Sequence, residues 1–213
     1  MFDMISKKYD LINDLISFYT HKFAKTKAIK SLEIPNGAKV LDLCCGSGDL
    51  GRIAKKINKS IEVIGVDFSS EMLKIAQKKN RNITYFNQDA TNLSFEDETF
   101  DYVVMGFGLR NIENQDKALE EIKRVLKRDG KFLHLDFNNK SFLNKLYDKI
   151  ILFLLKIFLK EIEPYLYLID SKHDLYNNKE LIKNFKDVGF KHIFDKEILF
   201  KMIAFQIVQK ETL

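Results

Sequence analysis

The sequence feature that most constrains the fold is a regular alternation of short apolar runs with stretches of helical periodicity. Apolar runs typical of buried strands occupy residues 39–43, 62–67, 83–86, 101–105 and 131–137. Between them, residues 50–57, 72–76 and 118–126 place apolar side chains three and four positions apart, as on one face of a helix. Strands that alternate with single helices form βαβ units with right-handed crossovers. The pattern therefore predicts an α/β fold with a doubly wound, mostly parallel sheet and helices on both faces.

The C-terminal part of the chain has a different pattern. Residues 190–210 contain two apolar runs without helical period, which predicts a closing antiparallel hairpin, although its turn, Leu199-Phe200-Lys201, lacks the usual Gly or Asn. No linker-like break or internal repeat interrupts the 213 residues. We therefore expect one domain over residues 1–213.

Composition excludes several classes of protein. The two cysteines, Cys44 and Cys45, are neighbours, so they indicate a reducing compartment and no disulfide framework. The net charge of +5 is spread over the helices, which argues against a nucleic-acid groove. No targeting segment is visible, and the most apolar stretch, residues 150–159, is far shorter than the ~20 residues that span a bilayer. We expect a cytoplasmic protein, either soluble or peripheral at the inner face of the membrane, with no metal site.

The chemistry of the sequence concentrates where the predicted strands end. The first strand continues into a glycine-rich loop, DLCCGSGDLG, over residues 42–51, in which glycines allow a sharp turn and a close approach to a ligand. Asp67 ends the second strand about 20 residues after Gly48, where a carboxylate can accept both hydroxyls of a ribose. These two features fit an NAD-dependent oxidoreductase as well as other nucleoside-binding proteins.

Three further acids favour a nucleoside that carries positive charge. Asp42 lies inside the first strand, where a carboxylate suits a ligand with an ammonium group. Asp49 stands where a pyrophosphate would lie over a helix N-terminus and would repel that anion. Asp89, followed by Ala90, comes just after the third strand, where it can accept a hydrogen bond from an adenine amino group. Each acid alone also suits a helix cap or a turn, but together they indicate S-adenosyl-L-methionine as the cofactor.

The same residues carry a resemblance to a known family. The segments DLCCGSGDL, GVDFSSEML and QDATNLSF resemble class I S-adenosylmethionine methyltransferases. The segment GFGLRN, residues 106–111, and the opening of the chain resemble more narrowly the ubiquinone/menaquinone biosynthesis C-methyltransferase family (UbiE/MenG). The resemblance covers nearly the whole chain. It implies a Rossmann-like seven-stranded sheet, an N-terminal helical lid over residues 1–34 and a helical substrate-side insertion over residues 138–175.

The resemblance also implies an activity and a set of site residues. The implied reaction transfers a methyl group from S-adenosyl-L-methionine to a ring carbon of a prenylated hydroquinone, with demethylmenaquinol favoured over a benzoquinol, and leaves S-adenosyl-L-homocysteine. The implied cofactor-binding residues lie in the glycine-rich loop and at the following strand ends: Asp42, Gly46, Ser47, Gly48, Asp67, Phe68, Asp89, Ala90 and Gly106. Gly106 stands where the family often has a small hydroxyl residue. A homodimer is compatible with the sequence.

Methylation of an aromatic carbon needs a phenolate that pushes electron density onto the ring, and a protein must position the ring and stabilise the oxyanion. Arg110 has the fixed charge and planar fork for that task, and we hypothesise that it lowers the pKa of the phenol while Asn111 orients the proton acceptor. An ion pair between Arg110 and a nearby acid is the alternative. Tyr9 and His21, in the predicted lid, are candidate proton acceptors; a packed tyrosine and a surface histidine are the alternatives.

The apolar stretch over residues 142–162 allows two interpretations. It suits a groove for a prenyl tail or a contact with the membrane surface, and equally a buried helix that closes the cofactor cleft. Three other functions stay open at this point: a class I methyltransferase for a water-soluble molecule, an NAD-dependent oxidoreductase, and a non-catalytic subunit that keeps only the fold.

Overall fold

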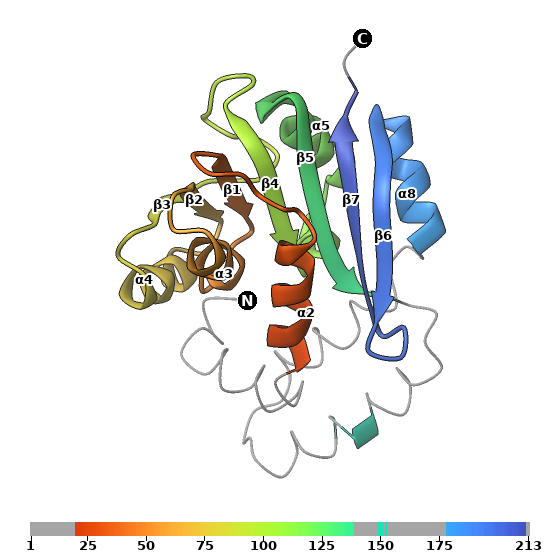
Figure 1. The fold of residues 1–213 in the computed structure, drawn as a ribbon, viewed down its shortest axis with the longest axis horizontal. Coiled ribbons are helices and arrows are strands. Elements are labelled where there is room, and N and C mark those ends of the chain that lie inside the picture. The colour runs from red at the N-terminus through yellow and green to blue at the C-terminus, as the bar shows by residue number, and fades with distance from the viewer. Residues whose placement is uncertain (1–19, 139–148, 151, 153–177, 212–213) are drawn as a thin grey trace.

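The computed structural model describes residues 20–138, 149–150, 152 and 178–211 (Figure 1). The predicted site residue Tyr9 lies outside these residues. So do most of the predicted lid over residues 1–34, of which helix α2 (Thr20–Lys30) is described, and nearly all of the predicted insertion. No helix in the described ranges combines the length and the apolar character that a membrane crossing requires.

The described strands form one seven-stranded sheet in the order β3-β2-β1-β4-β5-β7-β6. Its strands are β1 (Lys39–Leu43), β2 (Glu62–Asp67), β3 (Thr84–Asn87), β4 (Phe100–Gly106), β5 (Leu126–Phe137), β6 (Phe190–Ile198) and β7 (Ile203–Lys210). Strands β1 to β5 pair in parallel, and β7 pairs antiparallel with both β5 and β6. The α/β fold predicted from the alternation, with its mostly parallel sheet and closing hairpin, is therefore confirmed.

Helices cover both faces because successive side chains of a strand point to opposite sides of the sheet. On β1, Leu41 and Leu43 pack into one hydrophobic cluster with α5 (Gln115–Val125) and α8 (Asn178–Asp187). Val40, which precedes Leu41 and faces the other side of the sheet, packs into a second cluster with α2 and α3 (Asp49–Ile57) (Figure 1). Helix α4 (Ser70–Lys79) contacts β2 and β3 at one edge of the sheet.

Two predicted boundaries are wrong: the end of the helix predicted over residues 118–126 and the start of the strand predicted over residues 131–137. The helix predicted over residues 118–126 ends at Val125, and the fully buried Leu126 instead begins β5, where it pairs with Phe100. The strand then bulges before Lys131 pairs with Tyr102, and Asp129 in the bulge has φ 60°. Helical spacing alone could not show this change, because Leu126 is an apolar residue that suits either element.

The hairpin closes without a glycine. Ile198 pairs with Ile203, and the first three of the four connecting residues, Leu199, Phe200 and Lys201, have φ values of 52°, 54° and 66°. Side-chain-bearing residues are strained in this left-handed region by roughly 1–2 kcal/mol each. The unusual turn composition noted in the sequence therefore produces a strained tip without preventing the hairpin.

Candidate active site

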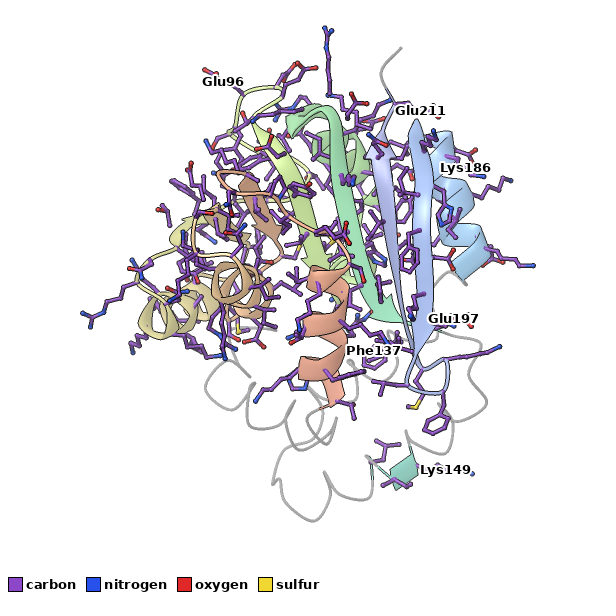
Figure 2. The ribbon with its side chains drawn as sticks, in the orientation of Figure 1. Glu96, Phe137, Lys149, Lys186, Glu197 and Glu211 are labelled. Carbon is purple, nitrogen blue, oxygen red and sulfur yellow. The ribbon has the colours of Figure 1, made fainter. Side chains whose placement is uncertain are left out.

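A cavity of about 980 Å³ lies at the carboxyl ends of the parallel strands. It sits where β1 has β2 on one side and β4 on the other, which is the position at which open α/β sheets bind ligands. Phe137 of β5 and Glu197 of β6 mark this edge of the sheet, whereas Glu96 and Glu211 mark the opposite edge (Figure 2). The cavity is lined by the strand ends and the turns that follow them: Leu43, Cys44, Gly46, Val66, Asp67, Phe68, Met72, Gln88, Asp89, Ala90, Thr91, Gly106, Phe107, Gly108, Asn111, Ile112, Glu113, Asn114, Gln115 and Asp116.

The glycine-rich loop bends sharply between β1 and α3. Cys44, Gly46 and Gly48 have φ values of 55°, 53° and 80°, so a side-chain-bearing residue accepts left-handed strain at Cys44. A Cβ atom added at Gly48 would lie 2.6 Å from Oη of Tyr85, which packs against the loop. The loop thus brings its backbone to the cavity at Gly46, while Ser47 and Gly48 are not among the residues that line it.

Asp67 joins three elements at one side of the cavity. Its carboxylate accepts hydrogen bonds from the backbone N–H of Gly46 at 2.7 Å and from that of Ser69 at 2.9 Å. The Ser69 hydroxyl in turn accepts from Met72 N and caps α4. These two donors hold the carboxylate of Asp67 at the wall of the cavity, at the end of β2.

Asp89 and its neighbours form the next part of the wall. Oδ1 of Asp89 accepts hydrogen bonds from N and Oγ1 of Thr91 at 2.8 and 2.9 Å, which fixes the carboxylate at the cavity. Ala90 is buried beside it, and Phe68, 79% exposed, lines the same cavity. Two carboxylates beside apolar walls and a glycine cradle fit the adenosine part of S-adenosylmethionine.

Asp42 lies beneath the glycine-rich loop and does not line the cavity. It is 2% exposed, and its Oδ2 accepts a hydrogen bond from Gly51 N at 2.7 Å. Burial raises the pKa of Asp42 to about 7, while the Gly51 hydrogen bond and the charge of Lys25 act in the opposite direction. In this geometry Asp42 holds the N-terminal turn of α3 against β1.

Asp49 connects the N-terminal helix to the loop. Burial alone would raise the pKa of Asp49, but Lys25, Lys79 and Arg52 hold it well below its usual range. Lys25 Nζ lies 2.9 Å from one carboxylate oxygen, and Arg52 Nη2 lies 3.1 Å from the other. Lys79 also donates to the Ser47 hydroxyl at 2.9 Å. An ionised Asp49 at the first turn of α3 disfavours a dinucleotide pyrophosphate there, which argues against the oxidoreductase alternative.

Arg110 and Asn111 belong to the short helix η1 (Leu109–Asn111), which follows β4 at the cavity. The Arg110 side chain is buried and donates from Nη1 to Oδ1 of Asp136, so the ion pair considered as the alternative is present. Its guanidinium also packs against the rings of Phe107 and Phe137, whose centroids lie 5.9 and 5.5 Å from Cζ. The packing fixes Arg110 directly behind the wall formed by Phe107, Gly108 and Asn111.

Asn111 presents an amide to the cavity. Its Nδ2 donates to the Phe107 carbonyl at 3.1 Å. Its Oδ1 is buried, and within the described part of the chain it has no hydrogen-bond partner. An acceptor in this state suits a ligand that carries a hydroxyl donor.

Two residues, one of them a candidate, differ from the expectation based on the sequence. His21 is only 8% exposed on α2, so its interpretation as a surface histidine is wrong, although it does not line the cavity. Asp136 was missed by the sequence analysis. The available signal was an acid at the second-last position of the apolar segment KFLHLDF. This position lies at the same edge of the sheet as Asp67 and Asp89.

Comparison with solved structures shows the same architecture in methyltransferases. A SAM-dependent methyltransferase from Thermotoga maritima has a TM-score of 0.72 at 21% identity, with 99% of this chain and 98% of that chain covered. A SAM-dependent methyltransferase from Aquifex aeolicus has a TM-score of 0.70 at 18% identity, with 94% and 97% covered. At these identities the likeness concerns the fold.

Comparison of sequences is more specific. The demethylmenaquinone methyltransferases of Staphylococcus aureus strains JH9 and Newman are each 35% identical to this chain over 221 aligned positions, covering 99% of this chain and 92% of each relative. The model of the ubiE/COQ5 methyltransferase family matches residues 1–210. With this match over nearly every residue and the cavity at the expected edge of the sheet, the chain belongs to the ubiE/COQ5 methyltransferase family.

Proposed function

We propose that this chain transfers the methyl group of S-adenosylmethionine to a ring carbon of demethylmenaquinol, giving menaquinol. The observation that carries the proposal is the 35% identity to demethylmenaquinone methyltransferases along 99% of the chain. The cavity of about 980 Å³ is near the upper end of the usual range for small-molecule sites, which suits two reactants rather than one.

The cofactor side of the cavity is formed by the residues at the ends of β1, β2 and β3. When bound, S-adenosylmethionine supplies an electrophilic methyl group on a sulfonium. Asp67 is proposed to accept the ribose hydroxyls, and Asp89 to accept from the adenine amino group beside Ala90 and Phe68. Gly46 and Gly106 supply close backbone surface in the cavity wall, whereas Asp42, Ser47 and Gly48 act by holding the loop.

The substrate side is proposed to be the wall around η1. A hydroquinone hydroxyl can donate to Oδ1 of Asn111, which has no partner among the described residues, and this would fix the ring at the cavity wall. Loss of a hydroxyl proton makes the ring carbon next to it more nucleophilic. The carbon then forms its bond to the methyl group and afterwards releases its own hydrogen as a proton, so each turnover needs a proton acceptor.

Arg110 is proposed to stabilise the phenolate from behind this wall. Its charge is fixed by Asp136 and by the rings of Phe107 and Phe137, so it acts as a preorganised group rather than as a mobile side chain. His21 and Tyr9 remain proposed proton acceptors from the N-terminal segment. Because a prenylated substrate resides in a bilayer, we also propose a peripheral contact with the membrane.

The test is methyl transfer by the purified chain. S-adenosylmethionine and chemically reduced demethylmenaquinone are supplied, and the quinone is analysed by mass spectrometry for a gain of one methyl group. Arg110→Ala is expected to lose most turnover, whereas Arg128→Ala, at an exposed arginine near the opposite edge of the sheet, is the matched control and keeps it.

Two outcomes would contradict the proposal. If the wild-type protein binds S-adenosylmethionine but methylates only a methoxy-benzoquinol, demethylmenaquinol is not its substrate. Arg110→Ala with unchanged turnover would remove Arg110 from the proposed mechanism.

A further inference from the structure

A second buried histidine lies behind Arg110 and has no role in the function proposed so far. His134 and Asp136 both belong to β5, and they are exposed by only 2% each. Since alternate residues of a strand face the same side of the sheet, both side chains point toward the same layer. His134 pairs in register with Gln206 of β7, and its Nδ1 lies 2.9 Å from Oε1 of that residue.

The remaining polar atoms of the two side chains face each other. Nε2 of His134 lies 4.0 Å from Oδ2 of Asp136. Both atoms are buried, and neither has a hydrogen-bond partner within the described ranges. The other oxygen of Asp136 is saturated, because Oδ1 accepts from Arg110 Nη1 and from the backbone N–H of Phe137.

If Nε2 of His134 carried no hydrogen, two hydrogen-bond acceptors would face each other in a buried site. This would destabilise the folded protein, because neither acceptor would have a donor in place of water. One hydrogen on Nε2 of His134 would satisfy both atoms. The separation is about 1 Å longer than an N–H···O hydrogen bond, and a small rotation of either side chain closes it. The arrangement therefore needs a hydrogen on Nε2.

We propose that His134 is a positioning residue, which donates from Nε2 to Asp136 and thereby fixes the carboxylate that orients Arg110. The resulting chain runs from Gln206 through His134 and Asp136 to the guanidinium behind the cavity wall. This inference rests on the proposed function only for its effect on turnover, because the hydrogen-bond chain itself is a property of the folded protein.

The surroundings of His134 favour a neutral imidazole. Burial lowers its pKa and outweighs the charge of Asp136 and the Gln206 hydrogen bond, which both raise it, and the charge of Arg110 lowers it further. In the part of the chain that the structure describes, the other groups in contact with the ring are uncharged: Gln206 comes from β7, and Phe185 of α8 lies 5.8 Å away, centroid to centroid. A neutral ring with its hydrogen on Nε2 requires the Gln206 amide to present its NH₂ group to Nδ1, an orientation that differs from the present one by a 180° flip.

Two substitutions separate the hydrogen bond from the rest of the imidazole. The amide nitrogen of glutamine reaches the position of Nε2, so His134→Gln keeps a donor toward Asp136. The amide of asparagine reaches only the position of Nδ1, so His134→Asn keeps a partner for Gln206 and loses the donor toward Asp136. Phe185→Leu, which alters the packing on His134 without touching Asp136, is the control for a general disturbance of the core.

The first measurement is heteronuclear NMR of the imidazole nitrogens in the full chain, together with hydrogen exchange of the Arg110 Nε proton. We expect Nε2 of His134 to carry a hydrogen, and the Arg110 proton to exchange more than tenfold faster in His134→Asn than in wild type or His134→Gln. A ring with hydrogen only on Nδ1, or equal exchange in the two variants, would overturn the proposal. Neither readout depends on the substrate, so a failure of the proposed function is recognised separately.

Turnover is the second measurement. We expect kcat to fall about tenfold to a hundredfold in His134→Asn, the range that a small misplacement of a catalytic group produces. In His134→Gln it should stay within a few fold of wild type, with the same pH profile and an unchanged KM for S-adenosylmethionine. Phe185→Leu should lower Tm and leave kcat in place. Equal loss of kcat in both His134 variants would show that the imidazole acts in another way.

Discussion

The buried carboxylate of Asp42 makes a prediction that can be worked out from the structure. An acid with a raised pKa in the folded protein holds its proton more tightly there than in the unfolded chain. Its contribution to the free energy of unfolding is therefore greatest at low pH and falls as the pH rises from about 4 through about 7. Replacement by Asn, which cannot ionise, removes this dependence and keeps an oxygen for Gly51 N.

The size of the effect follows from the shift. The pKa of Asp42 rises from 3.8 to about 7 in the folded protein. At about 1.4 kcal/mol per unit of pKa, the whole penalty of ionisation approaches ~4 kcal/mol. Of this, about 2–3 kcal/mol develops between pH 5 and pH 8, because part of the penalty is already present at pH 5. The free energy of unfolding of Asp42→Asn minus that of wild type should increase by this amount over the interval.

Urea unfolding at pH 5, 6, 7 and 8, followed by far-UV circular dichroism, measures this difference. Asp101→Asn is the control: hydrogen bonds from Lys127 and from Lys39 N outweigh partial burial and lower the pKa of Asp101, so the carboxyl is ionised in both states above pH 5. Its difference from wild type should stay constant from pH 5 to 8. A difference for Asp42→Asn that is flat, or that decreases with pH, would refute the assignment of Asp42 as a carboxyl destabilised by burial.

Three further predictions concern the loop and the helices around it. Gly48→Ala should weaken S-adenosylmethionine binding measured by calorimetry, and lower Tm, because the residue has φ 80° and its new Cβ would lie 2.6 Å from Tyr85 Oη; an unchanged Kd and Tm would contradict the tight packing. Ser69→Ala should cost about 1 kcal/mol of unfolding free energy in urea, because it removes the cap of α4, and Ser69→Asp should restore most of it. Lys25→Met should reduce stability by roughly 1–3 kcal/mol at pH 7, because it leaves the carboxylate of Asp49 in a largely buried position with only part of its positive surroundings; since Asp49 then binds a proton more readily, the loss should become smaller at pH 4.

The sequence predicted the fold well because the fold depends on periodicity. Alternating apolar runs and helical faces determine which residues are buried, and the single hairpin at the end followed from the loss of helical period after Phe190. Boundaries were less predictable where an apolar residue suits two elements, as at Leu126. The hairpin turn was recognised as unusual, but its left-handed strain depends on tertiary pairing that no local rule contains.

The sequence identified some residues of the candidate site and misplaced or missed others. Asp67 and Asp89 were identified from their place after apolar strands, and the parallel topology brings both to one cavity. The same reasoning placed Asp42 at the ligand, yet its carboxylate turns toward Gly51, because a one-residue step along a strand reverses the side chain. Asp136 was not identified because its importance lies in its partner: only the folded sheet brings the end of β5 next to η1, 26 residues away along the chain.

The charges around the glycine-rich loop determine the electrostatic potential on one side of the cavity. Asp49 and Asp67 both contribute to the raised pKa of Asp42, which indicates a negative electrostatic potential around the loop. The nearby cations Lys25, Lys79 and Arg52 offset this potential mainly at Asp49. Negative potential in a partly buried site favours a ligand with net positive charge and disfavours phosphates. Arg110, by contrast, is compensated by Asp136 on the other side of the cavity. The cavity therefore has an acidic side, lined by Asp67 and Asp89, which would suit the positively charged cofactor proposed above, and another side where the fixed guanidinium of Arg110 adjoins Asn111. We expect this polarity, rather than the shape of the glycine-rich loop, to distinguish the proposed methyl-transfer site from a dinucleotide site.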